Sequence, residues 1–121
     1  MNNRLIKSFG YAWQGLKYCF CYEKNFGVQL STAIMTLLSG LYFRLSSHEW
    51  ITILFCSTLV LSLEMVNTTI EKLSNEISQS INPVIKQVKD IAAGAVFLSS
   101  IISFIVGMII FLPKIKLLFI N

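Results

Sequence analysis

Three long apolar segments limit what this chain can fold into more than any other feature of its sequence. They cover about residues 26–45, 50–66 and 91–112. At a rise of about 1.5 Å per residue, a helix of this length crosses most of the ~30 Å hydrocarbon core of a bilayer. Only 13% of the 121 residues are charged, whereas soluble domains carry about a quarter. We therefore expect a single all-α membrane domain, residues 1–121, with three transmembrane helices.

The N-terminal residues 4–22 predict a different kind of helix. Apolar residues recur there at steps of three and four, while the basic residues fall on another side of the helix. Aromatic residues such as Trp13 are of the type that settles at headgroup depth. We expect an amphipathic helix that lies on the membrane surface.

The connections between the segments are short. Residues 46–49 read as a polar hairpin between the first two spans. Residues 67–80 contain neither Gly nor Pro, so the second helix is expected to continue into water as a cytoplasmic extension. Asn82 is a good N-cap and Pro83 a good first residue for the third helix, which we expect to end before Pro113.

The distribution of Lys and Arg predicts the orientation. With three spans, the N-terminal segment and the second connection share one side, which carries seven basic residues against three on the other (Arg4, Lys7, Lys17, Lys24, Lys72, Lys86 and Lys89 against Arg44, Lys114 and Lys116). The positive-inside rule then places the N-terminus in the cytoplasm. The basic residues form no patch with stacking aromatics, so no nucleic-acid partner is expected.

Four polar residues on the second helix form the most informative motif. Glu64, Asn67, Glu71 and Asn75 fall on one helical face at 100° per residue, running from the apolar segment into the interface. A carboxylate as deep as Glu64 costs a few kcal/mol in a membrane, which favours a functional role. The deeper carboxylate suits a general base and the more exposed Glu71 a metal ligand.

Further charged residues gather at the same boundary. Lys86, Lys89 and Asp90 precede the third span, where Lys89 is placed to neutralise phosphate. Positive-inside anchoring explains the two lysines equally well but not Asp90. Glu23, between the surface helix and the first span, could join Glu71 in holding Mg²⁺, which typically takes one or two carboxylates plus substrate phosphate. This set of groups suggests phosphoryl transfer to a lipid headgroup.

Two other classes of protein are alternatives to a lipid kinase. A small multidrug or ion transporter also uses one intramembrane Glu, but near the bilayer midplane, whereas these charges gather at the boundary. A non-enzymatic bundle or assembly subunit leaves the polar face unexplained. The three cysteines, an odd number without metal-ligand spacing, are expected to be small apolar residues in a reducing compartment.

Three motifs resemble the small integral-membrane lipid kinases of bacteria, diacylglycerol kinase and undecaprenol kinase. Residues 64–71 (EMVNTTIE) match the family's E-x-x-N-[ST]-x-I-E signature. Residues 86–96 (KQVKDIAAGAV) look like its K-x-x-K-D-x-[AG]-[AS]-x-A-V segment, and residues 4–16 resemble its surface helix. The likeness covers roughly residues 4–111.

The resemblance implies a kinase that phosphorylates a lipid alcohol, diacylglycerol or undecaprenol, with ATP, in the bacterial inner membrane. It implies a homotrimer whose active sites are built between protomers. It also implies roles for nine residues: Glu64 as general base with Asn67 beside it, Glu23 and Glu71 on the metal that bridges ATP, Lys89 and Asp90 at the phosphates, and Arg4, Tyr11 and Trp13 near nucleotide and lipid.

Two positions depart from the family pattern. Asn75 stands where relatives commonly carry Asp, which puts a carboxylate role there in doubt, and Gly27 stands where Arg is common. The Asn82-Pro83 turn and the AAGAV run at residues 92–96 lean weakly toward the undecaprenol branch.

Overall fold

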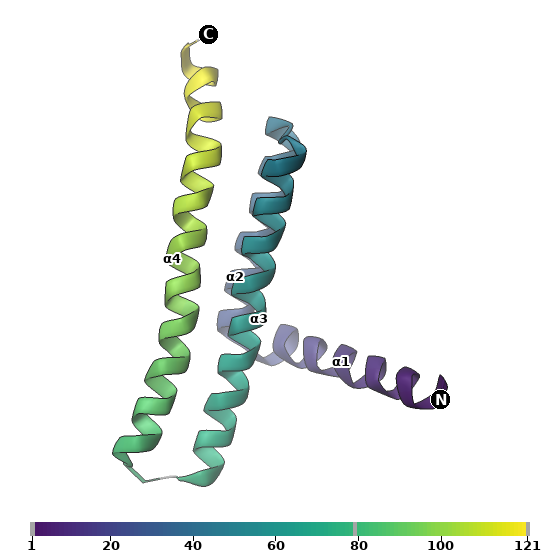
Figure 1. Ribbon diagram of the computed structural model, residues 1–121, viewed down its shortest axis with the longest axis vertical. Helices are drawn as coiled ribbons and strands as arrows, with labels where there is room; N and C mark the ends of the chain where they lie inside the picture. The colour runs from purple at the N-terminus through teal and green to yellow at the C-terminus, as the bar shows by residue number, and fades with distance from the viewer. Residues whose placement is uncertain (1, 79, 121) are drawn as a thin grey trace.

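The protein consists of four helices in a computed structural model that describes residues 2–78 and 80–120 (Figure 1). They are α1 (Asn2–Tyr22), α2 (Lys24–Phe43), α3 (Ser47–Ile77) and α4 (Pro83–Ile120). The last three are long and apolar enough to cross a membrane. The predicted all-helical fold with three candidate spans is therefore confirmed.

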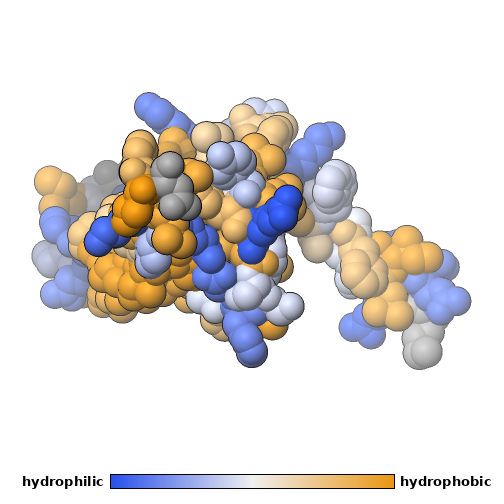
Figure 2. Space-filling view, turned by 90° about the horizontal axis from the view of Figure 1, so that it is seen from above, coloured by the Kyte–Doolittle hydropathy of each residue, from blue (hydrophilic) through white to orange (hydrophobic). Residues whose placement is uncertain are grey.

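Helices α2, α3 and α4 run side by side, and α1 projects sideways from them (Figure 1). The α3–α4 turn lies at one end of the bundle, and the α2–α3 turn and the C-terminus lie toward the other. Helix α3 is the centre of the packing, because it contacts both α2 and α4. Seen from above, hydrophobic residues gather on much of the bundle, with hydrophilic residues between them (Figure 2).

The α2–α3 turn differs from the expected hairpin of residues 46–49. Arg44 ends α2 in a left-handed conformation (φ 54°, ψ 62°), and only Leu45 and the N-cap residue Ser46 remain before α3. The Ser46 hydroxyl accepts from the Glu49 N–H at 3.3 Å, and Glu49 Oε1 accepts from the Ser46 N–H at 2.9 Å. This capping box satisfies two N–H groups at the helix start, so α3 begins at Ser47 rather than at residue 50.

The α3–α4 turn follows the prediction more closely. Asn82 Oδ1 accepts from the N–H groups of Val84 and Ile85 at 2.9 and 3.3 Å, and Pro83 is the first residue of α4. The Asn82-Pro83 helix start is therefore confirmed. The expected extension of α3 to residue 80 is too long, because α3 ends at Ile77; residue 79 lies outside the described residues.

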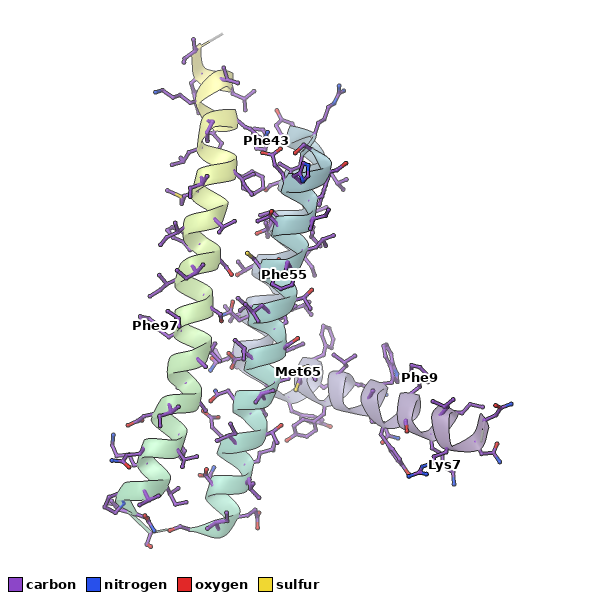
Figure 3. All side chains as sticks on the ribbon, viewed as in Figure 1. Lys7, Phe9, Phe43, Phe55, Met65 and Phe97 are labelled. Carbon is purple, nitrogen blue, oxygen red and sulfur yellow. The ribbon has the colours of Figure 1, made fainter. Side chains whose placement is uncertain are left out.

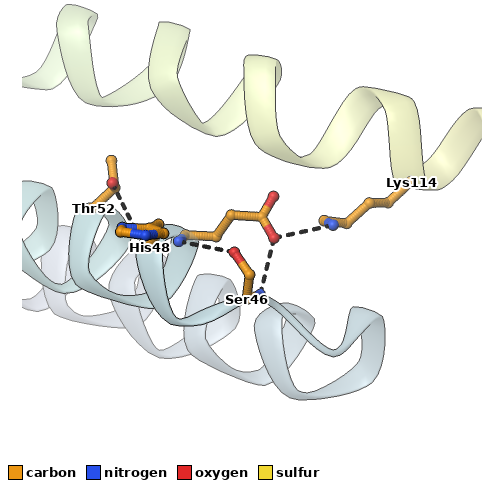
Figure 4. Close-up of polar contacts among 5 residues, drawn as sticks. Ser46, His48, Thr52 and Lys114 are labelled. Carbon is orange, nitrogen blue, oxygen red and sulfur yellow. Dashed lines mark hydrogen bonds and ion pairs between the residues drawn. The ribbon is translucent and has the colours of Figure 1, made fainter.

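The predicted end of the third transmembrane helix before Pro113 is wrong. Helix α4 passes through Pro113 and continues to Ile120, although an interior proline removes a backbone hydrogen bond and costs about 3 kcal/mol or more. The next residue, Lys114, forms an ion pair with Glu49 at 3.2 Å, and both side chains are about a quarter exposed. This contact holds the segment beyond Pro113 against the start of α3 (Figure 4).

Hydroxyl groups along α2 are satisfied within the helix. Four side chains donate to the carbonyl oxygen four residues earlier, at 2.8–3.0 Å (Ser31, Thr32, Thr36 and Ser39). Such internal bonds let polar residues sit in a segment that has no water to pair with. They explain why these hydroxyls do not interrupt the apolar character of the helix.

Candidate active site

The predicted polar face of α3 shows a gradient of exposure. Glu64 and Asn67 are buried, at 4% and 6% exposure, Glu71 is half-buried, and Asn75 is exposed. The gradient follows the predicted course from the apolar part of the helix toward its polar end. A row of carboxylates and amides is thereby presented at successive depths on one helix.

Three of these side chains line one hollow between α2, α3 and α4, which we call the central hollow. Its volume is about 360 Å³, and α3 contributes Glu64, Asn67 and Glu71 to its wall. Helix α2 adds Asn25 and Gln29, two amides that the sequence interpretation missed. Their only sequence signal is a polar residue in the first turns of an otherwise apolar helix.

Only one of the two polar atoms of the Asn67 amide has a hydrogen-bond partner among the described residues. Its Nδ2 donates to Glu71 Oε1 at 3.3 Å, whereas its Oδ1 is buried without a hydrogen-bond partner among the described residues. Leaving a buried acceptor unpaired costs about 1–3 kcal/mol. A cation or a hydroxyl donor bound in the central hollow would remove that cost.

Glu23 lies at the elbow between α1 and α2. It is the N-cap residue of α2, but its half-buried side chain makes no capping bond. Burial raises the pKa of the neighbouring Cys19 thiol, the negative charges of Glu23 and Glu64 raise it further, and Lys72 lowers it. Glu23 and Glu64 are therefore both close enough to Cys19, near the end of α1, to raise the pKa of its thiol, although they lie 41 residues apart in the sequence.

Lys89 and Asp90 point to different partners. Lys89 is half-buried, and its Nζ donates to Asn75 Oδ1 at 3.0 Å across the α3–α4 pair. Asp90 is exposed and forms an ion pair with Lys86, one turn earlier in α4, at 2.6 Å. The structure thus brings Lys89 to the polar face of α3, one turn beyond Glu71, while Asp90 is held on its own helix.

The three predicted site residues of α1 stay apart from the central hollow of their own chain. Arg4, Tyr11 and Trp13 are exposed on the outer part of the helix, in the region around Lys7 and Phe9 in Figure 3. The inner end of α1 is fastened instead by Lys72, whose Nζ lies 4.6 Å from the centre of the Tyr18 ring. Such a cation–π contact is worth about 0.5–1 kcal/mol at an exposed site.

The donor groups of the hollow suit a hard cation. In the described ranges, no cluster of three or more His, Cys, Asp or Glu side chains is arranged to hold a metal. The Glu71 carboxylate and the unpaired Asn67 Oδ1 are nevertheless oxygen donors in one hollow. Mg²⁺ prefers such oxygens and needs few from the protein when substrate phosphates complete its shell.

Buried carboxylate and amide groups between three candidate membrane-spanning helices are typical of a small membrane enzyme. Residues 10–111 match the family model of prokaryotic diacylglycerol kinase. The chain belongs to this family.

Three relatives span most of this chain. It is 39% identical over 112 residues to undecaprenol kinase of Bacillus subtilis, covering 93% of this chain and 91% of the relative. It is 34% identical over 110 residues to diacylglycerol kinase of Synechocystis, covering 90% and 63%. It is 22% identical over 102 residues to diacylglycerol kinase of Escherichia coli strain K12, covering 84% of each. The prediction of a membrane lipid kinase is confirmed, in preference to a transporter or a non-enzymatic subunit.

Proposed function

We propose that this protein transfers the γ-phosphoryl group of MgATP to the hydroxyl of a lipid alcohol at the cytoplasmic face of the bacterial inner membrane. The observation that carries the proposal is the central hollow, where Glu64 is buried beside Asn67 and Glu71. A lipid headgroup at the bilayer boundary and a nucleotide from water would meet at this depth. The excess of basic residues near α1 and the α3–α4 turn supports a cytoplasmic N-terminus.

Each polar side chain then has a definite task. Glu64 accepts the proton of the lipid hydroxyl. The hydroxyl oxygen forms a bond to the γ-phosphorus of ATP, while the bond between the γ-phosphorus and the bridging β-phosphate oxygen breaks and ADP leaves. Lys89 and Asp90 would contact the phosphates of ATP. Asn67 orients the Glu71 carboxylate through its Nδ2 and keeps its Oδ1 free for a ligand.

Glu71 and Glu23 are the residues that would hold Mg²⁺. When bound, this ion neutralises phosphate charge and helps to align the transferring group. The exposed α1 residues Arg4, Tyr11 and Trp13 would contact nucleotide and lipid. Because they stand away from their own hollow, we include a homotrimer with sites between protomers in the proposal.

We propose undecaprenol as the preferred acceptor over diacylglycerol. The support is the 39% identity to an undecaprenol kinase over nearly the whole of both chains. The Asn82-Pro83 turn, which starts α4 here, points the same way.

An assay with γ-labelled ATP tests both parts of the proposal. The purified protein is presented with undecaprenol or diacylglycerol at equal mole fractions in the same detergent micelles, with and without Mg²⁺. We expect Mg²⁺-dependent transfer to both classes of lipid alcohol or to undecaprenol alone, with the higher kcat/KM for undecaprenol. Transfer to neither lipid would refute the kinase activity, and a higher kcat/KM for diacylglycerol would reverse the choice of acceptor.

A further inference from the structure

Two lysines near the start of α4 are held in contrasting ways. Lys86 is paired with the carboxylate of Asp90 at 2.6 Å. Lys89 donates to the neutral amide oxygen of Asn75 at 3.0 Å, and no carboxylate of residues 2–78 or 80–120 lies within ion-pair distance of it. Both lysines line a hollow of about 820 Å³ beneath the α3–α4 turn, which we call the turn hollow.

A hydrogen bond to an amide fixes the position of an ammonium group without cancelling its charge. A carboxylate at the same place would fix it equally well but would neutralise it, because opposite charges this close attract strongly. Lys89 is also half-buried, so water screens its charge less than that of an exposed lysine. Its positive charge therefore remains available to a third group.

We propose that Asn75 is a positioning residue that holds Lys89 in place while leaving its charge free for the phosphates of a bound nucleotide. The inference rests on the proposed function, since it takes a polyphosphate as the ligand. In this proposal the uncharged Asn75 contributes to nucleotide binding, whereas Glu64 contributes to phosphoryl transfer. Relatives with Asp at this position can still be active kinases under this proposal. The expected effect of Asp is a higher KM for MgATP, not a lower kcat.

The decisive variant is Asn75→Asp, which keeps the size of the side chain and its acceptor oxygen but adds a negative charge. Since a charge-assisted bond is roughly twice as strong as a neutral one, we expect the Kd for a Mg²⁺-bound non-hydrolysable ATP analogue to rise about tenfold. KM for MgATP should rise with it, and kcat should stay within about twofold. A purely structural anchor predicts the opposite, because Asp would hold Lys89 at least as firmly as Asn does.

Asn82→Asp is the matched control. It makes the same chemical change at the N-cap of α4, where Asp caps a helix as well as Asn does, and Asn82 Oδ1 accepts from the N–H groups of Val84 and Ile85 rather than from Lys89. We expect its Kd for the analogue to stay within about twofold of wild type, because its charge is not paired with the lysine. Equal weakening by both variants would show a general effect of charge and would overturn the proposal.

A second variant keeps the test valid if Asn75→Asp does not fold. Asn75→Leu has nearly the same shape but no acceptor, so Lys89 loses its anchor and binding should weaken about threefold. Wild-type affinity in Asn75→Leu, or in a folded Asn75→Asp, would refute the role of Asn75. Analogue binding is measured without lipid, so it still tests Asn75 if neither lipid is phosphorylated, an outcome that would refute the proposed function alone.

Discussion

Glu64 is deeply buried near the middle of α3, where the apolar segment of the helix gives way to its polar part. It is 4% exposed and shares the central hollow with Asn67 and Glu71. A carboxylate kept for packing alone would be costly there, because burying a charge without a partner is unfavourable. A proton acceptor, in contrast, must reach the lipid hydroxyl at this depth.

Replacing Glu64 with Gln tests this role directly. Gln keeps the shape of the side chain and removes the base, so we expect kcat to fall about 10² to 10⁴-fold with little change in KM for ATP. Ser74→Ala, a buried polar position on the same helix but outside the central hollow, should retain activity. If Glu64→Gln keeps more than about a tenth of the wild-type kcat, Glu64 is not the base.

Glu71 offers an equally clean substitution. Gln at this position still accepts the hydrogen bond from Asn67 Nδ2, so only the charge is lost. Because Mg²⁺ is usually bound through one or two carboxylates together with substrate phosphates, we expect Glu71→Gln to abolish activity at low Mg²⁺ while the protein stays folded. The exposed Glu76→Gln serves as the control for a change of net charge. Normal turnover of Glu71→Gln at low Mg²⁺ would contradict the metal assignment.

At the scale of the helices, the sequence predicts those helix ends that are set by interactions within a single turn. Asn82 and Pro83 start α4 as predicted, because a cap and a fixed φ act within a single turn. The start of α3 is equally local, but the prediction of a hairpin at residues 46–49 overlooks the capping box of Ser46 and Glu49. The passage of α4 through Pro113 was not predictable in the same way, since the Lys114–Glu49 contact joins residues 65 positions apart.

The turn between α2 and α3 depends on one close approach. A Cβ atom added at Gly40 would lie 2.8 Å from the Trp50 ring and 2.9 Å from Leu45 Cδ1. We expect Gly40→Ala to lower stability by about 1–3 kcal/mol through overpacking, seen as a lower Tm in detergent. At Gly27 on the same helix nothing lies within 4 Å of the added atom, so Gly27→Ala should match or exceed wild-type stability by about 0.5–1 kcal/mol. Equal Tm values for the two variants would contradict the close approach.

At the scale of the whole molecule, the interior formed by one chain is small. Its buried apolar residues are few, and large side chains such as Phe97 and Ile109 are 68% exposed. Hydropathy and periodicity predicted the three spans, because they report on which surfaces avoid water. They did not predict that Lys89 meets Asn75, since that contact depends on how α4 is aligned against α3.

The position of α1 bears most directly on how a complete site is formed. Arg4, Tyr11 and Trp13 are exposed on a helix that leads away from the central hollow of its own chain. If these residues act at a site, that site belongs to another protomer, which a closed symmetric oligomer would supply. Subunit mixing distinguishes this arrangement from a site within one chain.

Two inactive variants should therefore complement each other when they are mixed in one oligomer. Glu64→Gln disables the central hollow, and Arg4→Ala combined with Trp13→Ala disables α1. In a trimer reassembled from equal amounts of both, each site needs one intact hollow and one intact α1 from different subunits, so about a quarter of the wild-type activity should return. The trimer itself is measured by light scattering in detergent. Mixed trimers without recovered activity would place every site within a single chain, where no sharing between subunits can restore it.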